Sequence, residues 1–329
     1  MTVQPKLRVL TCVFALFLLT ITCFGAAANA EQYIVRIPLK GPHIYRSLVE
    51  QNIEILALNR DGLLDVLADA KQLDYLQTIG VPISVIHTPD MQGVGAALDD
   101  NLGMYHTYAE METVLTDLNT HYPSLAALDV MGTSIEGRNI YVLKISDNVT
   151  SSEGEPEVLI MGCHHARELM SVDVPLRFAV YLLENYGIDP TVTEMVNERE
   201  IYIAPMINPD GHVYVQQNHD GSPSSWWRKN RRDNGDGSIG VDLNRNYGYE
   251  WGYDNIGSSP SPWEITYRGS GPFSEPETQA VRDFCNSHRI TMWLSYHTYG
   301  ELLLYPWGFD ALYTPDHDVY LALGDTLTS

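Results

Sequence analysis

The chain has 329 residues, of which 44% are hydrophobic and 19% are charged. This length is enough for one sizeable domain plus a smaller one, and the composition excludes an intrinsically disordered protein. The formal net charge of -22 at pH 7 argues against nucleic-acid binding, which needs a basic surface.

Residues 1–30 have the pattern of a secretory signal peptide. Lys6 and Arg8 precede an apolar run over residues 9–24, and Ala28-Asn29-Ala30 supplies small residues for cleavage after Ala30. An uncleaved membrane anchor is the alternative, but the run is short for a span. We therefore predict a secreted protein, extracellular or periplasmic, with no membrane contact after cleavage.

Four cysteines are present, and Cys12 and Cys23 fall within the predicted signal. An oxidising compartment would permit a disulfide between the other two, Cys163 and Cys285. Two buried thiols are the alternative, because Cys163 is expected at the end of a core strand and Cys285 in a helix. The sequence leaves both open.

Residues 31–88 predict a small unit with the element order βαββαβ. Asp61-Gly62 between two apolar runs is typical of a β-hairpin. The order indicates a ferredoxin-like α+β unit, and residues 89–103 are predicted to be the linker after it. The predicted strands are 33–39, 53–59, 63–67 and 83–87, and the predicted helices are 44–51 and 70–79.

From residue 104 onward, helices alternate with short apolar strands. This pattern predicts an α/β domain whose mixed, mostly parallel sheet is flanked by helices on both faces. Ser274-Glu275-Pro276-Glu277 is expected to start one helix through a capping box. The predicted strands are 125–130, 139–145, 158–161, 201–207 and 291–295, and the predicted helices include 108–122, one opening at Asp189-Pro190, and 274–288.

The segment 162–170, Gly-Cys-His-His-Ala-Arg-Glu-Leu-Met, is predicted to be a strand-to-helix turn. Open α/β sheets expose their chemistry at such turns. His165 and Glu168 lie three residues apart, so an imidazole and a carboxylate could converge on one cation. A catalytic zinc needs three protein ligands and an open position, and His297 follows the predicted strand 291–295. The alternatives are an ordinary polar turn for His165 and Glu168, and a hydrogen-bonded histidine at a strand end for His297.

Six motifs in order resemble those of the zinc carboxypeptidase family of the carboxypeptidase A and B type, most closely its bacterial carboxypeptidase T branch. The resemblance covers residues 105–304 almost continuously, and residues 31–88 are similar to the family's inhibitory pro-region. The motifs are His-Ala-Arg-Glu, Ile-Asn-Pro-Asp-Gly, Trp-Arg-Lys-Asn-Arg, Asp-Leu-Asn-Arg-Asn-Tyr, Phe-Ser-Glu-Pro-Glu-Thr and His-Thr-Tyr.

The resemblance implies roles for particular residues. His165, Glu168 and His297 would be the ligands of one Zn²⁺. Asn244 and Arg245 would bind the C-terminal carboxylate of the substrate, and Arg228 would stabilise the oxyanion. A guanidinium stays protonated and pairs bidentately with a carboxylate, so this clamp would make the enzyme an exopeptidase.

Weaker resemblances concern the periphery of the site. Arg167 and Tyr299 resemble residues that line the substrate groove. Non-proline cis peptides are implied at 298–299 and 306–307. Three carboxylates resemble Ca²⁺ ligands of the carboxypeptidase T branch, and oxygen ligands suit that ion, although solvated acidic loops are the alternative. These carboxylates are Glu155, Glu157 and Glu200.

The sequence departs from the family after His297. In the family a tyrosine and a general-base glutamate lie well beyond the third zinc ligand, whereas here only residues 298–329 follow it. We therefore expect the catalytic domain, 104–329, to be incomplete at its C-terminus. Removing a general base costs about 10²- to 10⁴-fold in rate, so the chain itself is expected to be inactive.

Together these features predict the secreted precursor of a zinc metallocarboxypeptidase that hydrolyses the last peptide bond of peptides and proteins with zinc-activated water. We expect a monomer that its own pro-region inhibits until cleavage in the linker. Two alternatives remain: a non-catalytic binding protein that keeps the carboxylate clamp, and a zinc amidase acting on cell-wall or acylated amino-acid substrates.

Overall fold

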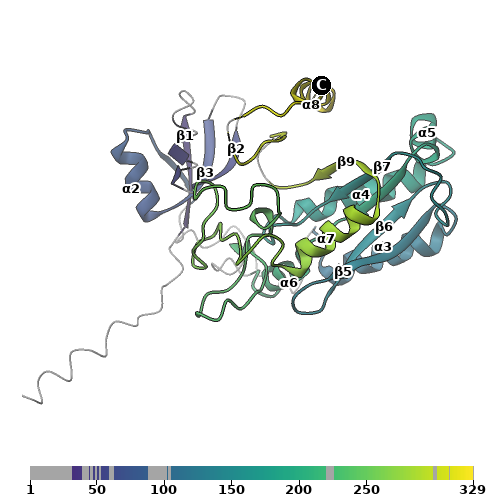
Figure 1. Ribbon diagram of the computed structural model, residues 1–329, viewed down its shortest axis with the longest axis horizontal. Coiled ribbons are helices and arrows are strands. Elements are labelled where there is room, and N and C mark those ends of the chain that lie inside the picture. The colour runs from purple at the N-terminus through teal and green to yellow at the C-terminus, as the bar shows by residue number, and fades with distance from the viewer. Residues whose placement is uncertain are drawn as a thin grey trace, which may run out of the picture.

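The computed structural model describes residues 32–38, 44, 47–48, 50–51, 53–58, 63–87, 102, 105–219, 226–298, 302–310 and 312–328. The predicted signal peptide lies outside these residues, as does all of the predicted linker except Leu102. The described residues form two sheets, one of four strands and one of five, and the two lie apart in Figure 1.

The smaller sheet has the strand order β2-β3-β1-β4, and all its pairs are antiparallel. Asp69 begins α2 with a capping box in which its carboxylate accepts from Gln72 N at 2.7 Å. The sequence predicted the element order βαββαβ, and the structure shows its four strands and its second helix, whereas the predicted helix 44–51 lies partly outside the described residues. The elements are β1 (Gln32–Pro38), β2 (Glu54–Leu58), β3 (Leu63–Asp69), α2 (Ala70–Thr78) and β4 (Ser84–His87).

The larger sheet has the strand order β5-β6-β8-β7-β9. The pairs β5·β6 and β6·β8 are antiparallel, whereas β7 pairs in parallel with both β8 and β9. The sheet is therefore mixed, as predicted, with its parallel half around β7. The strands are β5 (Ala126–Thr133), β6 (Asn139–Ile145), β7 (Glu157–Met161), β8 (Glu200–Ala204) and β9 (Ile290–Ser295).

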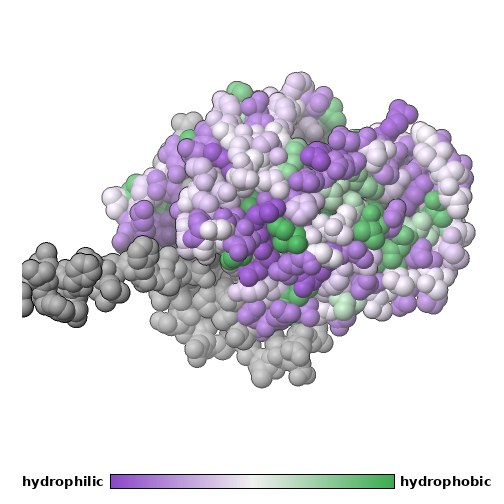
Figure 2. Space-filling model, turned by 60° about the horizontal axis from the view of Figure 1, so that its bottom comes forward, coloured by the Kyte–Doolittle hydropathy of each residue, from purple (hydrophilic) through white to green (hydrophobic). Residues whose placement is uncertain are grey.

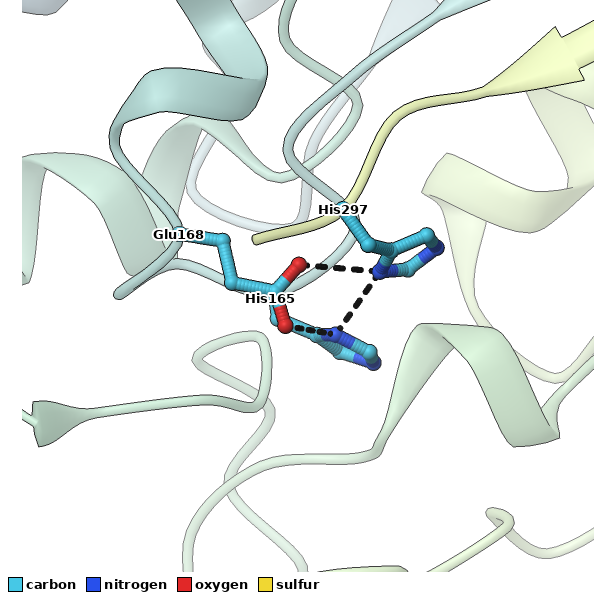
Figure 3. Close-up of side chains that lie close together, drawn as sticks. All are labelled: His165, Glu168 and His297. Atoms are coloured by element: carbon cyan, nitrogen blue, oxygen red, sulfur yellow. Dashed lines mark hydrogen bonds and ion pairs between the residues drawn. The ribbon is translucent and has the colours of Figure 1, made fainter. Parts of the chain in front are cut away.

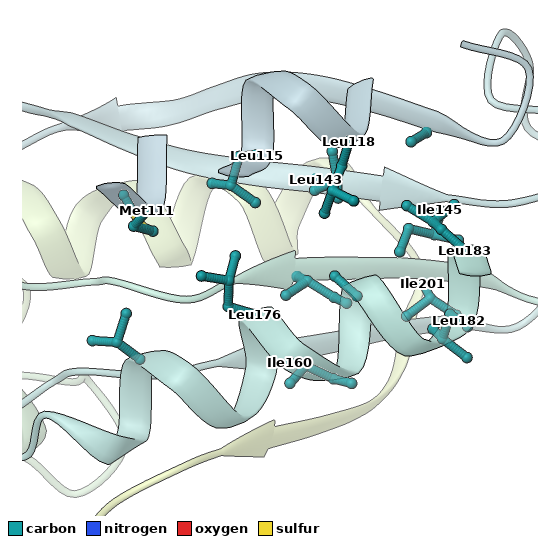
Figure 4. Packing of buried hydrophobic residues seen from close by; sticks show 14 of the residues in the cluster. Met111, Leu115, Leu118, Leu143, Ile145, Ile160, Leu176, Leu182, Leu183 and Ile201 are labelled. Atoms are coloured by element: carbon teal, nitrogen blue, oxygen red, sulfur yellow. The ribbon is translucent and has the colours of Figure 1, made fainter. Parts of the chain in front are cut away.

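Helices cover both faces of the larger sheet, which confirms the prediction. Ile160 packs into one cluster with α3, α4 and α5 (Figure 4), and its neighbours Leu159 and Met161 pack into another with α7. Alternate strand residues face opposite sides, so one strand serves two cores. The α-helices that follow residue 104 are α3 (Tyr108–His121), α4 (Met170–Asn185), α5 (Pro190–Asn197), α6 (Pro209–Gln217), α7 (Pro276–Ser287) and α8 (His317–Thr328).

The predicted start of α7 is wrong in detail. The helix begins at Pro276, with Glu275 as its N-cap and no side-chain capping bond. The carboxylate of Glu275 instead accepts from Asn230 Nδ2 and Arg232 Nε, both at 2.8 Å. A tertiary ion pair has replaced the expected local cap.

The two cysteines are free thiols on opposite faces of the larger sheet. Cys163 lies in the cluster under α4, and Cys285 packs against the cluster under α7. The sheet separates them, so both are thiols as that alternative states, but only Cys163 is buried and Cys285 is partly exposed.

The visible surface is mainly hydrophilic, with hydrophobic side chains gathered in separate patches (Figure 2). Within the described part of the chain, no helix combines the length and the apolar character needed to cross a bilayer.

The packing predicts a stability difference between two isoleucines. Ile203 on β8 is fully buried, whereas Ile188 is 77% exposed. Ile203→Ala should lower the free energy of unfolding by about 2–5 kcal/mol, because it leaves a cavity, and Ile188→Ala by less than about 0.5 kcal/mol. Urea denaturation of both variants measures this, and equal losses would contradict the assigned core.

Candidate metal centre

The turn between β7 and α4 presents His165 and Glu168, as predicted. Cys163 takes a left-handed backbone conformation, with φ of 53°, and its N–H donates to Ser171 Oγ at 3.0 Å. Ala166 N also donates to Arg228 O at 3.0 Å. These bonds hold the turn tight, and both predicted ligands lie buried in it.

His297 reaches the same place from β9. Because β9 pairs in parallel with β7, with Ser295 opposite Met161, both strands end at one edge of the sheet. His297 Nδ1 lies 2.9 Å from Glu168 Oε2 and 3.1 Å from His165 Nδ1. His165 Nδ1 lies 2.7 Å from Glu168 Oε1. Figure 3 shows the three side chains pointing at one another, so the structure brings the predicted ligand residues together.

This donor set fits a zinc ion. Two imidazole nitrogens and one carboxylate form a common catalytic zinc set, with a fourth position left open. Ligand atoms about 2.0–2.1 Å from a tetrahedral zinc lie roughly 3.3 Å apart, close to the separations of 2.7–3.1 Å observed here. His165 Nε2 has its own partner, Asp242 Oδ1, at 3.2 Å. A proton on Nε2 leaves the Nδ1 lone pair facing the centre.

The charges around the centre keep Glu168 ionised. Burial by itself raises the pKa of this carboxyl, but His165 and His297 outweigh burial and lower its pKa well below the usual range. Burial lowers the pKa of His297. For His165, burial opposes the charged form, yet Glu168 and Asp242 raise its pKa overall. Metal binding here would therefore displace a proton from His165 at low pH.

Asp242 is a fully buried carboxylate that the sequence analysis assigned no role. Its Oδ1 faces His165, its Oδ2 accepts from Arg228 Nε at 3.0 Å, and Oδ1 also accepts from Asn244 N at 3.0 Å. Burial raises its pKa, but the charges of Arg228, His165 and Arg245 lower it well below the usual range. The sequence held one signal for this role, because Asp242 is the first residue of the recognised motif Asp-Leu-Asn-Arg-Asn-Tyr.

The predicted substrate residues flank Asp242. Arg228 is 5% exposed. Asn244 and Arg245 belong to the short helix η2 (Leu243–Arg245), which Asp242 caps, and the side chain of Asn244 is exposed. Arg245 Nε donates to Gly257 O at 2.6 Å.

The peripheral predictions have mixed outcomes. Arg167 Nη1 donates to Trp226 O at 3.2 Å. Tyr299 lies outside the described residues, and so does the predicted cis bond before it. The predicted cis peptide between Pro306 and Trp307 is present.

The structure does not support the predicted calcium site. Glu157 accepts from Arg289 N at 2.9 Å, and Glu200 pairs with Lys144 at 3.0 Å, so both carboxylates already have protein donors as partners. Among the described residues, the acidic group close enough to share a cation is another one, Asp147, Glu153 and Glu155. It is exposed or partly exposed, as solvated acidic loops are.

The segment that carries Arg228 is fixed by a second buried carboxylate, Glu277. Its Oε1 accepts from Ile135 N and its Oε2 from Asn230 Nδ2, both at 3.2 Å. Burial raises the pKa of Glu277 to about 7, and the nearby Glu275 adds to this rise.

This pKa predicts how stability varies with pH. The pKa of Glu277 in the folded protein, about 7, lies above the ordinary glutamate value of 4.5. Its contribution is therefore fully present below about pH 4.5 and is lost as pH rises through about 7. Glu277→Gln should raise the melting temperature at pH 8 relative to the parent and change it little at pH 5.

Thermal unfolding at both pH values measures the effect, with Glu198→Gln at an exposed position as the control. A Glu277→Gln shift of the same size at pH 5 and pH 8 would contradict the raised pKa.

Comparisons with known proteins agree with this geometry. A family model described as zinc carboxypeptidase matches residues 111–329. The zinc carboxypeptidase of Saccharothrix mutabilis subsp. capreolus is 33% identical over 316 residues, which cover 87% of this chain and 68% of that protein. Carboxypeptidase A1 of Sus scrofa is 36% identical over 220 residues, 66% of this chain and 50% of the relative. The chain thus spans about half the length of that mammalian relative.

The solved structures support the fold. Carboxypeptidase A from Helicoverpa armigera superposes with a TM-score of 0.72 at 24% identity, covering 91% of this chain and 77% of the other. Bovine thrombin-activatable fibrinolysis inhibitor, solved with a tick carboxypeptidase inhibitor, gives a TM-score of 0.57 at 29% identity over 66% and 68% of the two chains. Since the family match covers most of the chain and the Saccharothrix protein aligns with most of it, this chain belongs to the zinc carboxypeptidase family.

Proposed function

We propose that this protein is an exported zinc metallocarboxypeptidase that removes the last residue of peptides and proteins. One observation carries the proposal. The group of His165, Glu168 and His297 is joined through the single carboxylate of Asp242 to Arg228 and to the short helix that carries Arg245. The arginines can hold a substrate carboxylate while the metal-binding group acts on the peptide bond next to it.

Substrate binding would begin at Asn244 and Arg245. The guanidinium of Arg245 pairs with the C-terminal carboxylate, and the exposed amide of Asn244 adds a neutral donor that orients it. Only the end of a peptide carries this carboxylate. The clamp therefore selects the last peptide bond.

Bond cleavage would occur next to the three ligand residues, His165, Glu168 and His297. Zinc, when bound there, supplies a Lewis acid that polarises the carbonyl and lowers the pKa of water. Arg228 donates to the carbonyl oxygen as negative charge develops on it. Because Asp242 already orients the Arg228 guanidinium, this stabilisation needs little rearrangement and is worth several kcal/mol in a dry site.

We further propose that the small unit of residues 31–88 is an inhibitory pro-region, and that Arg167 and Tyr299 contact more distant parts of the substrate. Leu102, at the end of the predicted linker, is buried with Ala166 and Leu169 of the metal-binding turn. This packing favours activation by cleavage before Leu102. We expect the processed enzyme to be a monomer.

Asp242→Asn should weaken zinc binding. An amide cannot match the charge that orients His165 and Arg228, and loss of such an outer partner typically costs about 10- to 100-fold in metal affinity. Competition with a chromogenic chelator measures the dissociation constant, and Asp117→Asn, at an exposed position, is the matched control. Unchanged affinity in Asp242→Asn would contradict this role.

Arg245→Ala should impair peptide cleavage. Protein expressed from the complete reading frame, cleaved in the linker before Leu102 and loaded with zinc should release the last amino acid from N-acylated dipeptide acids but not from their C-terminal amides. Losing a charge-assisted pair costs roughly 1.5–3 kcal/mol, so kcat/KM for the acid should fall about 10- to 100-fold.

Arg282→Ala, which removes a partly exposed arginine paired with Asp283, should leave these kinetics unchanged. Equal cleavage of acid and amide would favour an amidase. Zinc binding without any cleavage would favour a non-catalytic binding protein.

A further inference from the structure

His164 is a buried histidine that the roles above leave unexplained. It directly precedes the ligand residue His165 and is only 1% exposed. Its ring stacks on His297 at a centroid distance of 5.7 Å and an angle of 24°, and it meets Tyr247 at the same distance. An imidazole in this position costs free energy unless both nitrogens have partners.

Both nitrogens of His164 do have partners. Nε2 lies 2.7 Å from the Tyr247 hydroxyl, and Nδ1 lies 3.1 Å from Ser295 Oγ. Ser295 Oγ in turn lies 3.3 Å from Nε2 of His297. A chain of hydrogen bonds therefore runs from Tyr247 through His164 and Ser295 to the third ligand residue.

The direction of the protons follows from metal binding. If His297 presents its Nδ1 lone pair to a metal, its proton sits on Nε2, and that N–H donates to Ser295 Oγ. The hydroxyl of Ser295 is then free to donate to Nδ1 of His164. His164 must carry its own proton on Nε2 and donates it to the Tyr247 hydroxyl. The two histidines and Ser295 thus each find a donor or acceptor of the right kind, and the Tyr247 hydroxyl accepts from His164.

We propose that His164 is a positioning residue that acts through Ser295 to hold His297 in its metal-binding orientation and tautomer. The inference rests on the proposed zinc site. His165 is 4% exposed in its side chain and has Asp242 as the partner of its Nε2. His297 is 32% exposed in its side chain and has Ser295. The buried ligand residue, His165, is thus held by a carboxylate. The more exposed one, His297, is held by neutral groups, the Ser295 hydroxyl and the His164 ring behind it.

Two substitutions at His164 separate the relay from packing. The amide of His164→Asn reaches the place of Nδ1 and can still accept from Ser295, whereas that of His164→Gln reaches the place of Nε2 and serves Tyr247. We expect His164→Asn to keep its zinc dissociation constant within about 3-fold of the parent. His164→Gln and Ser295→Ala should both weaken binding about 10- to 100-fold.

The measurements are chelator competition for zinc and the visible absorption spectrum of the Co²⁺ form, which reports ligand geometry. Thermal unfolding shows that each variant is folded. His288→Asn is the control, because His288 follows the end of α7 and its Nδ1 bonds to the backbone oxygen of Phe284. It should lower stability without changing zinc affinity or the Co²⁺ spectrum.

Parent-like zinc affinity and Co²⁺ spectra in His164→Gln and Ser295→Ala would overturn the relay and leave the zinc site standing. Equal losses in His164→Asn and His164→Gln would assign the effect to ring packing and also overturn it. A parent protein that binds no zinc in a 1:1 ratio would instead reject the proposed metal site, and the relay with it.

Discussion

One buried carboxylate, that of Asp242, connects the parts of the candidate site. It faces a ligand histidine, pairs with Arg228 and caps the short helix that carries Arg245. A lone buried carboxylate is costly, so its charge is stable only while these cationic and N–H partners surround it. This requirement joins the metal-binding group to the cations around it, so the position of one constrains the other.

The sheet explains why distant residues meet. Only its half around β7 is parallel, and there the ends of β7 and β9 bring His165 and His297 to one edge, 132 residues apart in sequence. The antiparallel half, β5 and β6, completes the two cores without contributing a ligand residue. The candidate metal centre thus lies where a parallel α/β sheet exposes its strand ends.

The sequence predicted the parts of this arrangement that depend on local pattern. The apolar pattern predicted a strand before the turn and a helix after it, and the recognised motifs named His165, Glu168 and His297. The sequence did not predict the partners of charged side chains that lie far apart along the chain. Glu275 resembled part of a helix cap but serves Arg232, and the carboxylate of Glu200 resembled a calcium ligand but pairs with Lys144. The bridging role of Asp242 was likewise hidden, because its partner His165 lies 77 residues away.

The central claim is that two imidazoles and one carboxylate bind a single zinc ion at this sheet edge. Crystals of the protein grown with zinc, with anomalous diffraction recorded on both sides of the zinc absorption edge, test it most directly. The account predicts one strong peak about 2.0–2.2 Å from Nδ1 of His165, Nδ1 of His297 and a carboxylate oxygen of Glu168. No peak there, or a peak bound by other residues in a fully zinc-loaded crystal, would contradict it.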